Sequence, residues 1–255
     1  MRICLIGAGN MATQLGMALL EKGHQIVQVW SRTQQSAAKL ASKLNCPYTT
    51  ETSSITSKTD IYILAINDTA IESVLLQRSW GDTLVVHTAG SIPMNILTLY
   101  CTNYGVFYPF QTFTIEKKVD FDQIPVCIEA NTPQNLEILN GLAQSISQNI
   151  KLFDSNQRQQ IHLAAVFVCN FVNHFYTIGE KLLTEKGIDF EILKPLILET
   201  ASKVIYQSPE SSQTGPASRN DKIVMDKHLE MLANDPDLKN LYSLLSERII
   251  QTHKS

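Results

Sequence analysis

Apolar residues in roughly the first 150 positions fall into short continuous runs, which alternate with segments where they recur every three or four residues. Short apolar runs bounded by turn residues are typical of strands buried on both faces. We predict strands at residues 2–6, 25–30, 61–66, 83–87, 106–108 and 126–129, and helices at residues 11–22 and 33–44. The alternation of the two patterns predicts an α/β fold with a mainly parallel sheet.

The strand pattern ends at about Phe153, and the rest of the chain has helical spacing. We predict helices at residues 157–186, 190–206, 221–233 and 236–251, and an exposed loop at residues 207–218, which are rich in Ser, Pro, Gln and Gly. The change of pattern near Asp154 predicts two domains, an α/β domain of residues 1–153 and an all-helical domain of residues 154–255.

The most apolar long stretch of the chain covers residues 161–178. It is interrupted by the polar residues His162, Asn170, Asn173 and His174. Polar side chains are costly inside a membrane, so this pattern predicts a buried helix and not a membrane span.

The turn between the first strand and the first helix reads Gly7-Ala8-Gly9-Asn10-Met11-Ala12. This is the GxGxxA form of the dinucleotide-binding fingerprint, in the strand–turn–helix context that it requires. Gly7 permits the tight turn, Gly9 lets the backbone approach a diphosphate, and Ala12 allows close helix packing. An incidental glycine-rich turn would leave the flanking strand and helix unexplained. We therefore predict a Rossmann domain whose diphosphate site includes Gly7, Gly9, Asn10 and Met11.

The end of the second strand predicts which dinucleotide binds. An acidic residue here would bind both hydroxyls of an adenosine ribose, but the chain has Ser31, Arg32 and Thr33 instead. A guanidinium flanked by two hydroxyls suits the 2′-phosphate of NADP. Helix capping by Ser31 and Thr33 and simple solvation of Arg32 are the alternatives. S-adenosylmethionine, which also carries a ribose diol, is a weaker candidate for the same reason.

Further cofactor contacts are expected at the carboxyl ends of neighbouring strands, where ligands of parallel sheets bind. The candidates are Ala65, Ile66, Asn67 and Thr88. We expect Asp68 to cap a helix that begins at Thr69. For His87, at a strand end, an ordinary hydrogen-bonded histidine is favoured over a proton donor.

Composition narrows the functional classes. The formal net charge is −3, and acidic and basic residues are interleaved along the chain. The basic stripe that nucleic-acid binding needs is therefore not indicated. The five cysteines have neither CxxC nor metal-ligand spacing, so we expect no metal and reduced thiols. The N-terminal residues lack the pattern of a signal peptide. These features predict a cytoplasmic protein.

The chain resembles a family in the 6-phosphogluconate dehydrogenase-like group, in which a Rossmann-like domain precedes a helical domain of unknown function. The resemblance rests on residues 7–12, 87–90, 108–113, 162–174 and 213–221. The fusion is also similar to pyrroline-carboxylate reductases and deazaflavin-dependent NADP oxidoreductases. The resemblance implies an NADP-dependent oxidoreductase that dimerises through its helical domain, but it implies no substrate. The resemblance implies His-Pro where this chain has Tyr108-Pro109. If that histidine is the catalytic acid in relatives, a phenol or another group takes that role here.

The helical domain supplies the other candidate residues. On a uniform α-helix, His162, Asn170 and Asn173 fall within an arc of about 80°. His162, with Tyr108 and Asn170, is our catalytic candidate set, because a histidine or phenol can donate the proton that accompanies hydride transfer. For the helix residues, hydrogen bonding among polar groups of a buried helix is an equal alternative. For Tyr108, the alternative is a buried tyrosine with a satisfied hydroxyl.

Substrate binding is assigned to Asn173, to Thr214 and to Arg219, which follows the restricted backbone of Gly215-Pro216. An arginine on a rigid loop suits a carboxylate or phosphate. The alternative is an Arg219–Asp221 ion pair that fixes the loop, and Asp221 is also expected to cap the next helix.

The sequence thus predicts an NADPH-dependent reductase of a C=O or C=N bond in a small polar substrate. A non-catalytic NADP-binding sensor or scaffold remains the alternative, because fold alone does not establish a reaction. A homodimer is expected, since the helical half is apolar around Pro195, for example at Leu193, Leu196 and Leu198.

Overall fold

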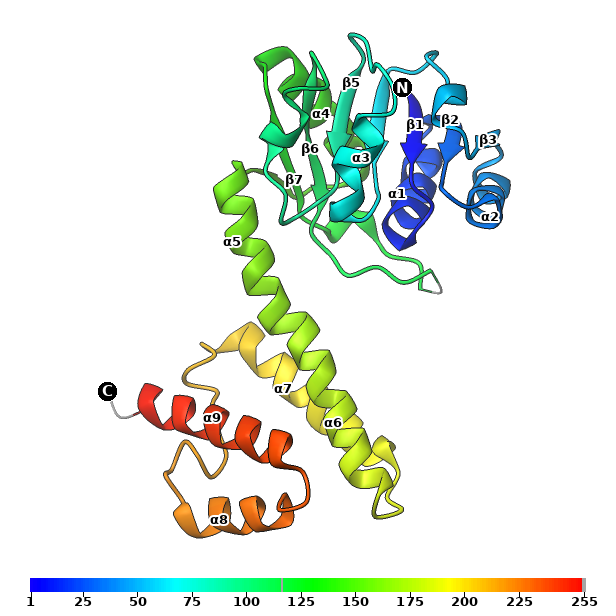
Figure 1. The fold of residues 1–255 in the computed structure, drawn as a ribbon. Coiled ribbons are helices and arrows are strands. Elements are labelled where there is room, and N and C mark those ends of the chain that lie inside the picture. The colour runs from blue at the N-terminus through cyan, green and yellow to red at the C-terminus, as the bar shows by residue number, and fades with distance from the viewer. Residues whose placement is uncertain (116, 254–255) are drawn as a thin grey trace. The chain divides into compact units, whose positions relative to one another are not determined.

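The computed structural model describes residues 1–115 and 117–253, and the chain divides into two compact units, Met1–Val172 and Asn173–Ser255 (Figure 1). Each unit is described by itself below.

The first unit contains an eight-stranded sheet with the order β3-β2-β1-β4-β5-β6-β7-β8. The strands are β1 (Arg2–Ile6), β2 (Gln25–Trp30), β3 (Tyr48–Thr49), β4 (Ile61–Leu64), β5 (Leu84–His87), β6 (Tyr104–Pro109), β7 (Val126–Ala130) and β8 (Ile150–Leu152). Neighbouring strands are parallel except β6 and β7, which are antiparallel. The predicted mainly parallel sheet is confirmed. The edge strands β3 and β8 were not predicted, because two or three partly exposed residues carry no periodic signal.

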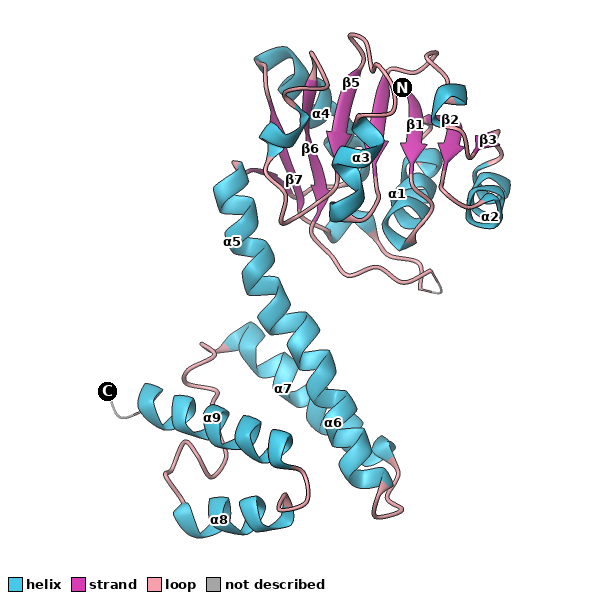
Figure 2. Cartoon of the chain, viewed as in Figure 1, coloured by secondary structure: helices cyan, strands magenta, loops and turns pink. Residues whose placement is uncertain are grey.

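Helices cover both faces of the sheet (Figure 2). They are α1 (Asn10–Glu21), α2 (Gln34–Leu44), α3 (Ile71–Leu75) and α4 (Pro133–Ile146), with short 3-10 helices at Thr52–Ser54, Asp68–Ala70, Met94–Leu97 and Phe121–Gln123. Alternate residues of β1 enter two different cores: Leu5 packs with residues of α1, α2 and α4, whereas Cys4 packs with residues of α3. Burial on both faces explains why the strands are apolar throughout.

Asp154 begins the helical part of the chain. Its carboxylate accepts from the backbone N–H of Gln157 (2.8 Å), and the Gln157 side chain accepts from the backbone N–H of Asp154 (3.1 Å), which forms a capping box. The following helical run consists of α5 (Ser155–Ala165), a π-helical segment (Val166–Phe171) and α6 (Val172–Thr184). The sequence change near Asp154 therefore marks the end of the strands, whereas the compact units divide inside this run.

The second unit continues with a 3-10 helix (Phe190–Leu193), α7 (Lys194–Tyr206), α8 (Lys222–Met231) and α9 (Pro236–Thr252). These agree with the predicted helices within a few residues. Residues 207–218 form neither helix nor strand, as the composition of that segment predicted.

The long helical run departs from the prediction in one respect. Leu163, Phe167 and Val168 are 52%, 60% and 73% exposed, so the expectation of a buried helix at residues 161–178 is wrong for the single chain. By length and composition alone, Ser155–Thr184 also meets the requirements of a membrane-crossing helix. Apolar residues at helical spacing indicate that a helix face is buried, but the spacing does not identify what buries it.

His87 is a fully buried histidine at the end of β5. Its Nδ1 accepts a hydrogen bond from the backbone N–H of Ala89 (3.2 Å), in agreement with the expected hydrogen-bonded histidine. Burial, and to a smaller extent the positive charge of Arg158, lowers the pKa of His87 from 6.5 to about 3. The imidazole is therefore neutral in the folded protein near neutral pH.

This burial predicts a pH-dependent loss of stability. In the unfolded chain His87 takes up a proton near pH 6.5, so its contribution is complete above that pH and is lost as the pH falls toward 3. Between pH 7.5 and pH 5, we expect the free energy of unfolding to fall by about 2 kcal/mol less in His87→Gln than in the unaltered protein. Urea unfolding at both pH values measures this. His174→Gln, which removes an exposed histidine, is the control, and equal losses in all three proteins would contradict the assignment.

Candidate functional site

The turn after β1 accepts only glycine at its first position. Gly7 has φ +124°, and a Cβ atom at Gly7 would lie 2.1 Å from the carbonyl oxygen of Ala65. Both observations exclude other residues. The close approach brings the carboxyl ends of β1 and β4 together, which is where a dinucleotide binds on such a sheet.

The N-terminus of α1 is open to an anion. Its N-cap is Gly9, no side chain caps it, and its first turn has no acidic residue. The first backbone N–H groups of a helix have no acceptor within the helix, and they carry the positive end of its dipole. The buried Ala12 and Gly16, where a Cβ would lie 2.8 Å from Leu5 Cδ1, keep α1 close to the sheet. These features fit the diphosphate of a dinucleotide.

A groove of about 280 Å³ extends from this turn toward the end of β2. Eight of the predicted cofactor residues line it: Gly7, Gly9, Ser31, Arg32, Thr33, Ala65, Ile66 and Asn67. Arg32 is exposed, and within residues 1–115 and 117–253 it forms no ion pair. A guanidinium without a protein partner at this place suits a phosphate ligand.

The other three predicted cofactor residues do not line the groove. The Asn10 side chain donates to the carbonyl oxygen of Phe113 (2.9 Å), Met11 packs against the core, and the buried Thr88 hydroxyl donates to the carbonyl oxygen of Leu64 (3.3 Å). Their side chains have structural partners. A role of these residues in cofactor binding stays a prediction.

The groove also contains residues that the sequence did not single out, namely Ala8, Trp30, Ser36, Ala70 and Val74. The Ser36 hydroxyl accepts from the Thr33 hydroxyl (2.9 Å), and Thr33 stands at the N-cap of α2 without capping it. Helix capping therefore does not explain Thr33. The position of Ser36 in the first turn of α2 was the available signal.

The expectation for Asp68 is wrong. Asp68 is the first residue of a 3-10 helix whose N-cap is Asn67, and no side chain caps that helix. The carboxylate instead accepts a hydrogen bond from the Ser91 hydroxyl. This contact ties the segment after β4 to the segment after β5, which sequence spacing could not reveal.

Two of the catalytic candidates are in contact in the first unit. The Tyr108 hydroxyl lies 3.1 Å from Nδ1 of His162, and the two rings meet edge to face. Tyr108 is the penultimate residue of β6 and is 8% exposed, whereas His162 lies on α5. Burial, with smaller effects of Cys127 and Asp68, raises the pKa of Tyr108 to about 12. The phenol therefore keeps its proton at neutral pH.

Gly90, in the segment after β5, is the third member of this contact. A Cβ atom at Gly90 would lie 2.5 Å from Nδ1 of His162 and 2.8 Å from Cζ of Tyr108. The pair therefore forms only because residue 90 has no side chain. Together these residues bring a buried proton donor and a partly exposed imidazole to the carboxyl edge of the sheet.

The remaining candidates are not brought into this contact. Asn170 is exposed in the π-helical segment. The prediction of a face shared with His162 and Asn173 assumed a uniform α-helix, and the wider π-helical turn changes the angle between these residues. Asn173, Thr214 and Arg219 are exposed residues of the second unit. Their roles in catalysis or substrate binding stay predictions.

Asp221 caps α8 as expected, because its carboxylate accepts from the backbone N–H of Val224 (3.2 Å). Across the described residues, no ion pair joins Arg219 to Asp221. The alternative explanation of Arg219 as the partner of Asp221 is therefore not supported.

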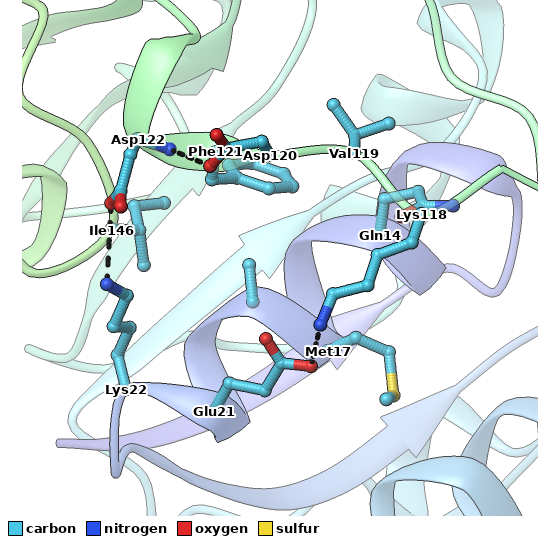
Figure 3. Close-up of a pocket in the computed structure, with 11 residues that line it drawn as sticks. Gln14, Met17, Glu21, Lys22, Lys118, Val119, Asp120, Phe121, Asp122 and Ile146 are labelled. Atoms are coloured by element: carbon cyan, nitrogen blue, oxygen red, sulfur yellow. Dashed lines mark hydrogen bonds and ion pairs between the residues drawn. The ribbon is translucent and has the colours of Figure 1, made fainter.

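A further groove of about 390 Å³ lies beside the C-terminal half of α1 (Figure 3). Four of its charged side chains form two ion pairs, Glu21 with Lys118 (2.7 Å) and Lys22 with Asp122 (3.4 Å), and the Asp120 carboxylate accepts from the backbone N–H of Asp122 (3.1 Å). None of the predicted cofactor, catalytic or substrate residues lines it. Because its charges are satisfied within the protein, we do not assign the cofactor to this groove.

Comparisons with known proteins agree with this geometry. Residues 2–90 match the family model "NADP oxidoreductase coenzyme F420-dependent", and residues 124–249 match the domain of unknown function DUF2520. No curated protein sequence matches the chain.

Solved structures give the same picture. A Bacteroides fragilis protein provisionally named an NADP oxidoreductase is 44% identical, with 98% of each chain covered and a TM-score of 0.92. A Thermotoga maritima protein is 21% identical, with 99% of this chain and 100% of that chain covered and a TM-score of 0.83. The 1-pyrroline-5-carboxylate reductase of Streptococcus pyogenes is 18% identical, with 100% and 99% covered and a TM-score of 0.66, and it shares the fold.

These matches confirm three predictions: the Rossmann domain with a helical C-terminal domain, the resemblance to NADP oxidoreductases, and NADP as the cofactor. They do not extend to a substrate.

The groove predicts a preference for the phosphorylated cofactor. We expect NADPH to bind at least several-fold more tightly than NADH, and Arg32→Ala to weaken NADPH binding about tenfold while changing NADH binding little, because a charge-assisted hydrogen bond is lost. Titration of nucleotide fluorescence measures both affinities. Lys43→Ala, which removes a cation of α2 outside the groove, is the control. Equal affinities for the two nucleotides would refute the assignment.

Proposed function

Since the chain belongs to the family that joins an F420-type NADP oxidoreductase domain to a DUF2520 domain, we propose that it is an NADPH-dependent reductase of a C=O or C=N bond in a small polar substrate. We further propose that it works in the cytoplasm, where its five free cysteines stay reduced. The observation that carries the proposal is the Tyr108–His162 contact at the carboxyl edge of the sheet.

Bound NADPH supplies the hydride, so the protein must bind and orient the reactants and supply a proton. Tyr108 is a candidate for the last task because its phenol carries a proton at neutral pH. Burial raises the pKa of Tyr108 to about 12, which opposes release of that proton, and the contact with His162 offsets this cost. When Tyr108 gives its proton to the substrate oxygen or nitrogen, an N–H at Nδ1 of His162 can stabilise the phenolate and return a proton to it. The partly exposed imidazole can exchange that proton with solvent.

The resemblance described above implies a His-Pro pair at the position of Tyr108-Pro109, so this assignment gives a role to the tyrosine found there. Here the histidine in contact comes from α5 instead, as His162, and the strand contributes a phenol. We propose that the two side chains together do the proton transfer.

We also propose a homodimer through the helical part of the chain. Leu163, Phe167, Val168 and Phe171 are exposed along one helical run, and so many adjoining apolar side chains are unusual on a monomer surface. A second copy of the same chain would bury them symmetrically, which is the commonest form of association.

The proton-transfer assignment predicts the effect of two substitutions. With NADPH and a panel of small oxo acids and cyclic imines, we expect Tyr108→Phe and His162→Ala to lower kcat about 100-fold or more, because each removes part of the proton donor. NADPH affinity should stay within about twofold, since neither residue lines the nucleotide groove. Absorbance at the NADPH band measures turnover.

Tyr104→Phe is the matched control, because it removes a tyrosine hydroxyl of the same strand that bonds Thr98 instead. Unchanged turnover in Tyr108→Phe would refute the role of the phenol. NADPH binding without consumption of any substrate in the panel would favour the sensor alternative.

The dimer predicts a mass of twice the 28.5 kDa chain in light scattering. Phe167→Glu with Val168→Glu should give a monomer, because the charges would be buried unpaired in the interface. Leu99→Glu, which changes an exposed leucine of the first unit, is the control. A monomeric unaltered protein would contradict the proposal, as would sedimentation of the chain with lipid vesicles in place of self-association.

A further inference from the structure

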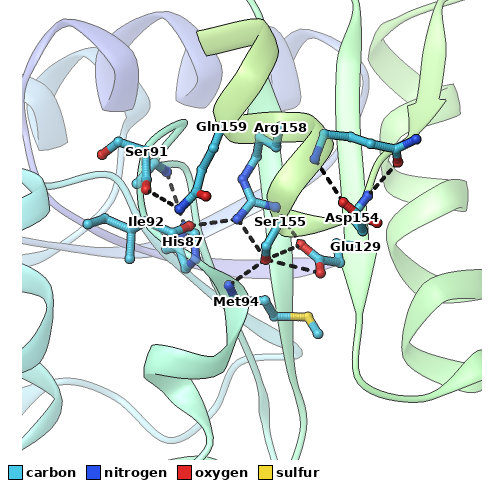
Figure 4. Close-up of polar contacts among 11 residues, drawn as sticks. His87, Ser91, Ile92, Met94, Glu129, Asp154, Ser155, Arg158 and Gln159 are labelled. Atoms are coloured by element: carbon cyan, nitrogen blue, oxygen red, sulfur yellow. Dashed lines mark hydrogen bonds and ion pairs between the residues drawn. The ribbon is translucent and has the colours of Figure 1, made fainter. Parts of the chain in front are cut away.

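The first two turns of α5 carry a polar stripe. Ser155, Arg158, Gln159 and His162 follow the spacing i, i+3, i+4 and i+7, so they share one helix face. Ser155, Arg158 and Gln159 contact the sheet or the segment after β5 (Figure 4). His162 contacts Tyr108 at the end of the sheet. The stripe therefore holds α5 on the sheet.

Arg158 is the central member of this stripe and is 0% exposed. Its Nη1 donates to the Glu129 carboxylate of β7 (2.5 Å), and its Nη2 donates to the carbonyl oxygen of Ile92 (2.6 Å). The planar guanidinium thus joins three segments in fixed directions, which a lysine ammonium cannot do.

Ser155 completes the network. Its hydroxyl donates to the Glu129 carboxylate (2.9 Å) and accepts from the backbone N–H of Met94 (2.9 Å). One turn further along, the Gln159 side chain donates to the carbonyl oxygen of Ser91 (2.8 Å). The segment from Ser91 to Met94 is therefore bound by three successive side chains of the helix.

A network of this kind is costly, because the buried ion pair loses its hydration and apolar replacements are often as stable. Stability alone is therefore a weak reason for it. Its geometry gives a stronger one: His162 lies one turn beyond Arg158, and Gly90 immediately precedes the bound segment. Because the Tyr108 hydroxyl lies at hydrogen-bond distance (3.1 Å) from Nδ1 of His162, a small displacement of α5 would break this contact.

We propose that Arg158 is a positioning residue, which acts through Glu129 and the Ile92 carbonyl to hold His162 against Tyr108. The proposal rests on the reductase function proposed above. Its test is chosen so that it does not depend on finding a substrate.

The experiment observes the Tyr108–His162 contact directly. In protein labelled at histidine and tyrosine, we expect a cross-peak between the two rings in the nuclear Overhauser spectrum. Arg158→Lys keeps the positive charge but lacks the planar guanidinium that binds Glu129 and the Ile92 carbonyl at once, so it should abolish this cross-peak. Gly90→Ala, which inserts a methyl group between the rings, should abolish it too.

If Arg158 only supported the fold, its replacement would also weaken NADPH binding. NADPH affinity is therefore measured together with the cross-peak. We expect it to stay within about twofold in Arg158→Lys, because Arg158 does not line the nucleotide groove. The double variant Arg158→Met with Glu129→Leu removes both buried charges and guards against misfolding caused by one uncompensated charge. It too should keep NADPH binding and lose the cross-peak.

Two outcomes would overturn the proposal: a cross-peak that persists in both Arg158 variants, or a loss of NADPH binding in both, which would make Arg158 a folding residue. Once a substrate is known, Arg158→Lys should lower kcat about 100-fold, as expected for a displacement of about 1 Å. Failure to find a substrate would count against the reductase proposal and leave the cross-peak result to decide this one.

Discussion

The site depends on one steric constraint, the absence of space for a side chain at Gly90. Three segments meet there: the end of β5, Tyr108 at the end of β6, and His162 on α5. The parallel order of β1, β4, β5 and β6 brings the nucleotide turn and this contact to the same edge of the sheet. Gly7 meets a similar constraint at the turn, against the carbonyl oxygen of Ala65. Close backbone approach thus shapes both the nucleotide groove and the Tyr108–His162 contact.

Much of the fold could be predicted from the sequence because the signals are local. Three features depend only on neighbours a few residues away and lie where expected. They are the strands β1 and β2, the turn from Gly7 to Ala12, and the segment around Arg32 at the end of β2. The parts that could not be predicted depend on distant partners. Arg158 and Glu129 are 29 residues apart, and the Asp68–Ser91 contact spans 23. No periodicity records such pairs, so Arg158 was not singled out and Asp68 was assigned to a helix cap.

The candidate site shows the same division. The Tyr108–His162 contact brings together two candidate residues 54 positions apart, of which Tyr108 was selected through the family resemblance and its place after a strand, and His162 through its chemistry. Ser36 was missed because a serine in a first helical turn is commonplace. The π-helical segment at Val166–Phe171 was also missed, since it has the same apolar composition as the α-helix around it. The hydrophobicity of the exposed Phe167 and Val168 indicated that these side chains pack against other atoms, but it did not identify the packing partner.

The antiparallel direction of β7 has a consequence for how the chain reaches the site. Glu129 pairs with Val106 in the first half of β6, while Tyr108 stands further along the same strand. Ser155, at the start of α5, contacts Glu129, and His162 contacts Tyr108, so this part of α5 runs in the same direction as β6. Since β8 is parallel to β7, both strands run opposite to β6, and the chain turns again after β8 to enter α5. This reversed pair of strands lets α5 run in the direction of β6 and bring His162 to Tyr108 at the carboxyl edge of the sheet.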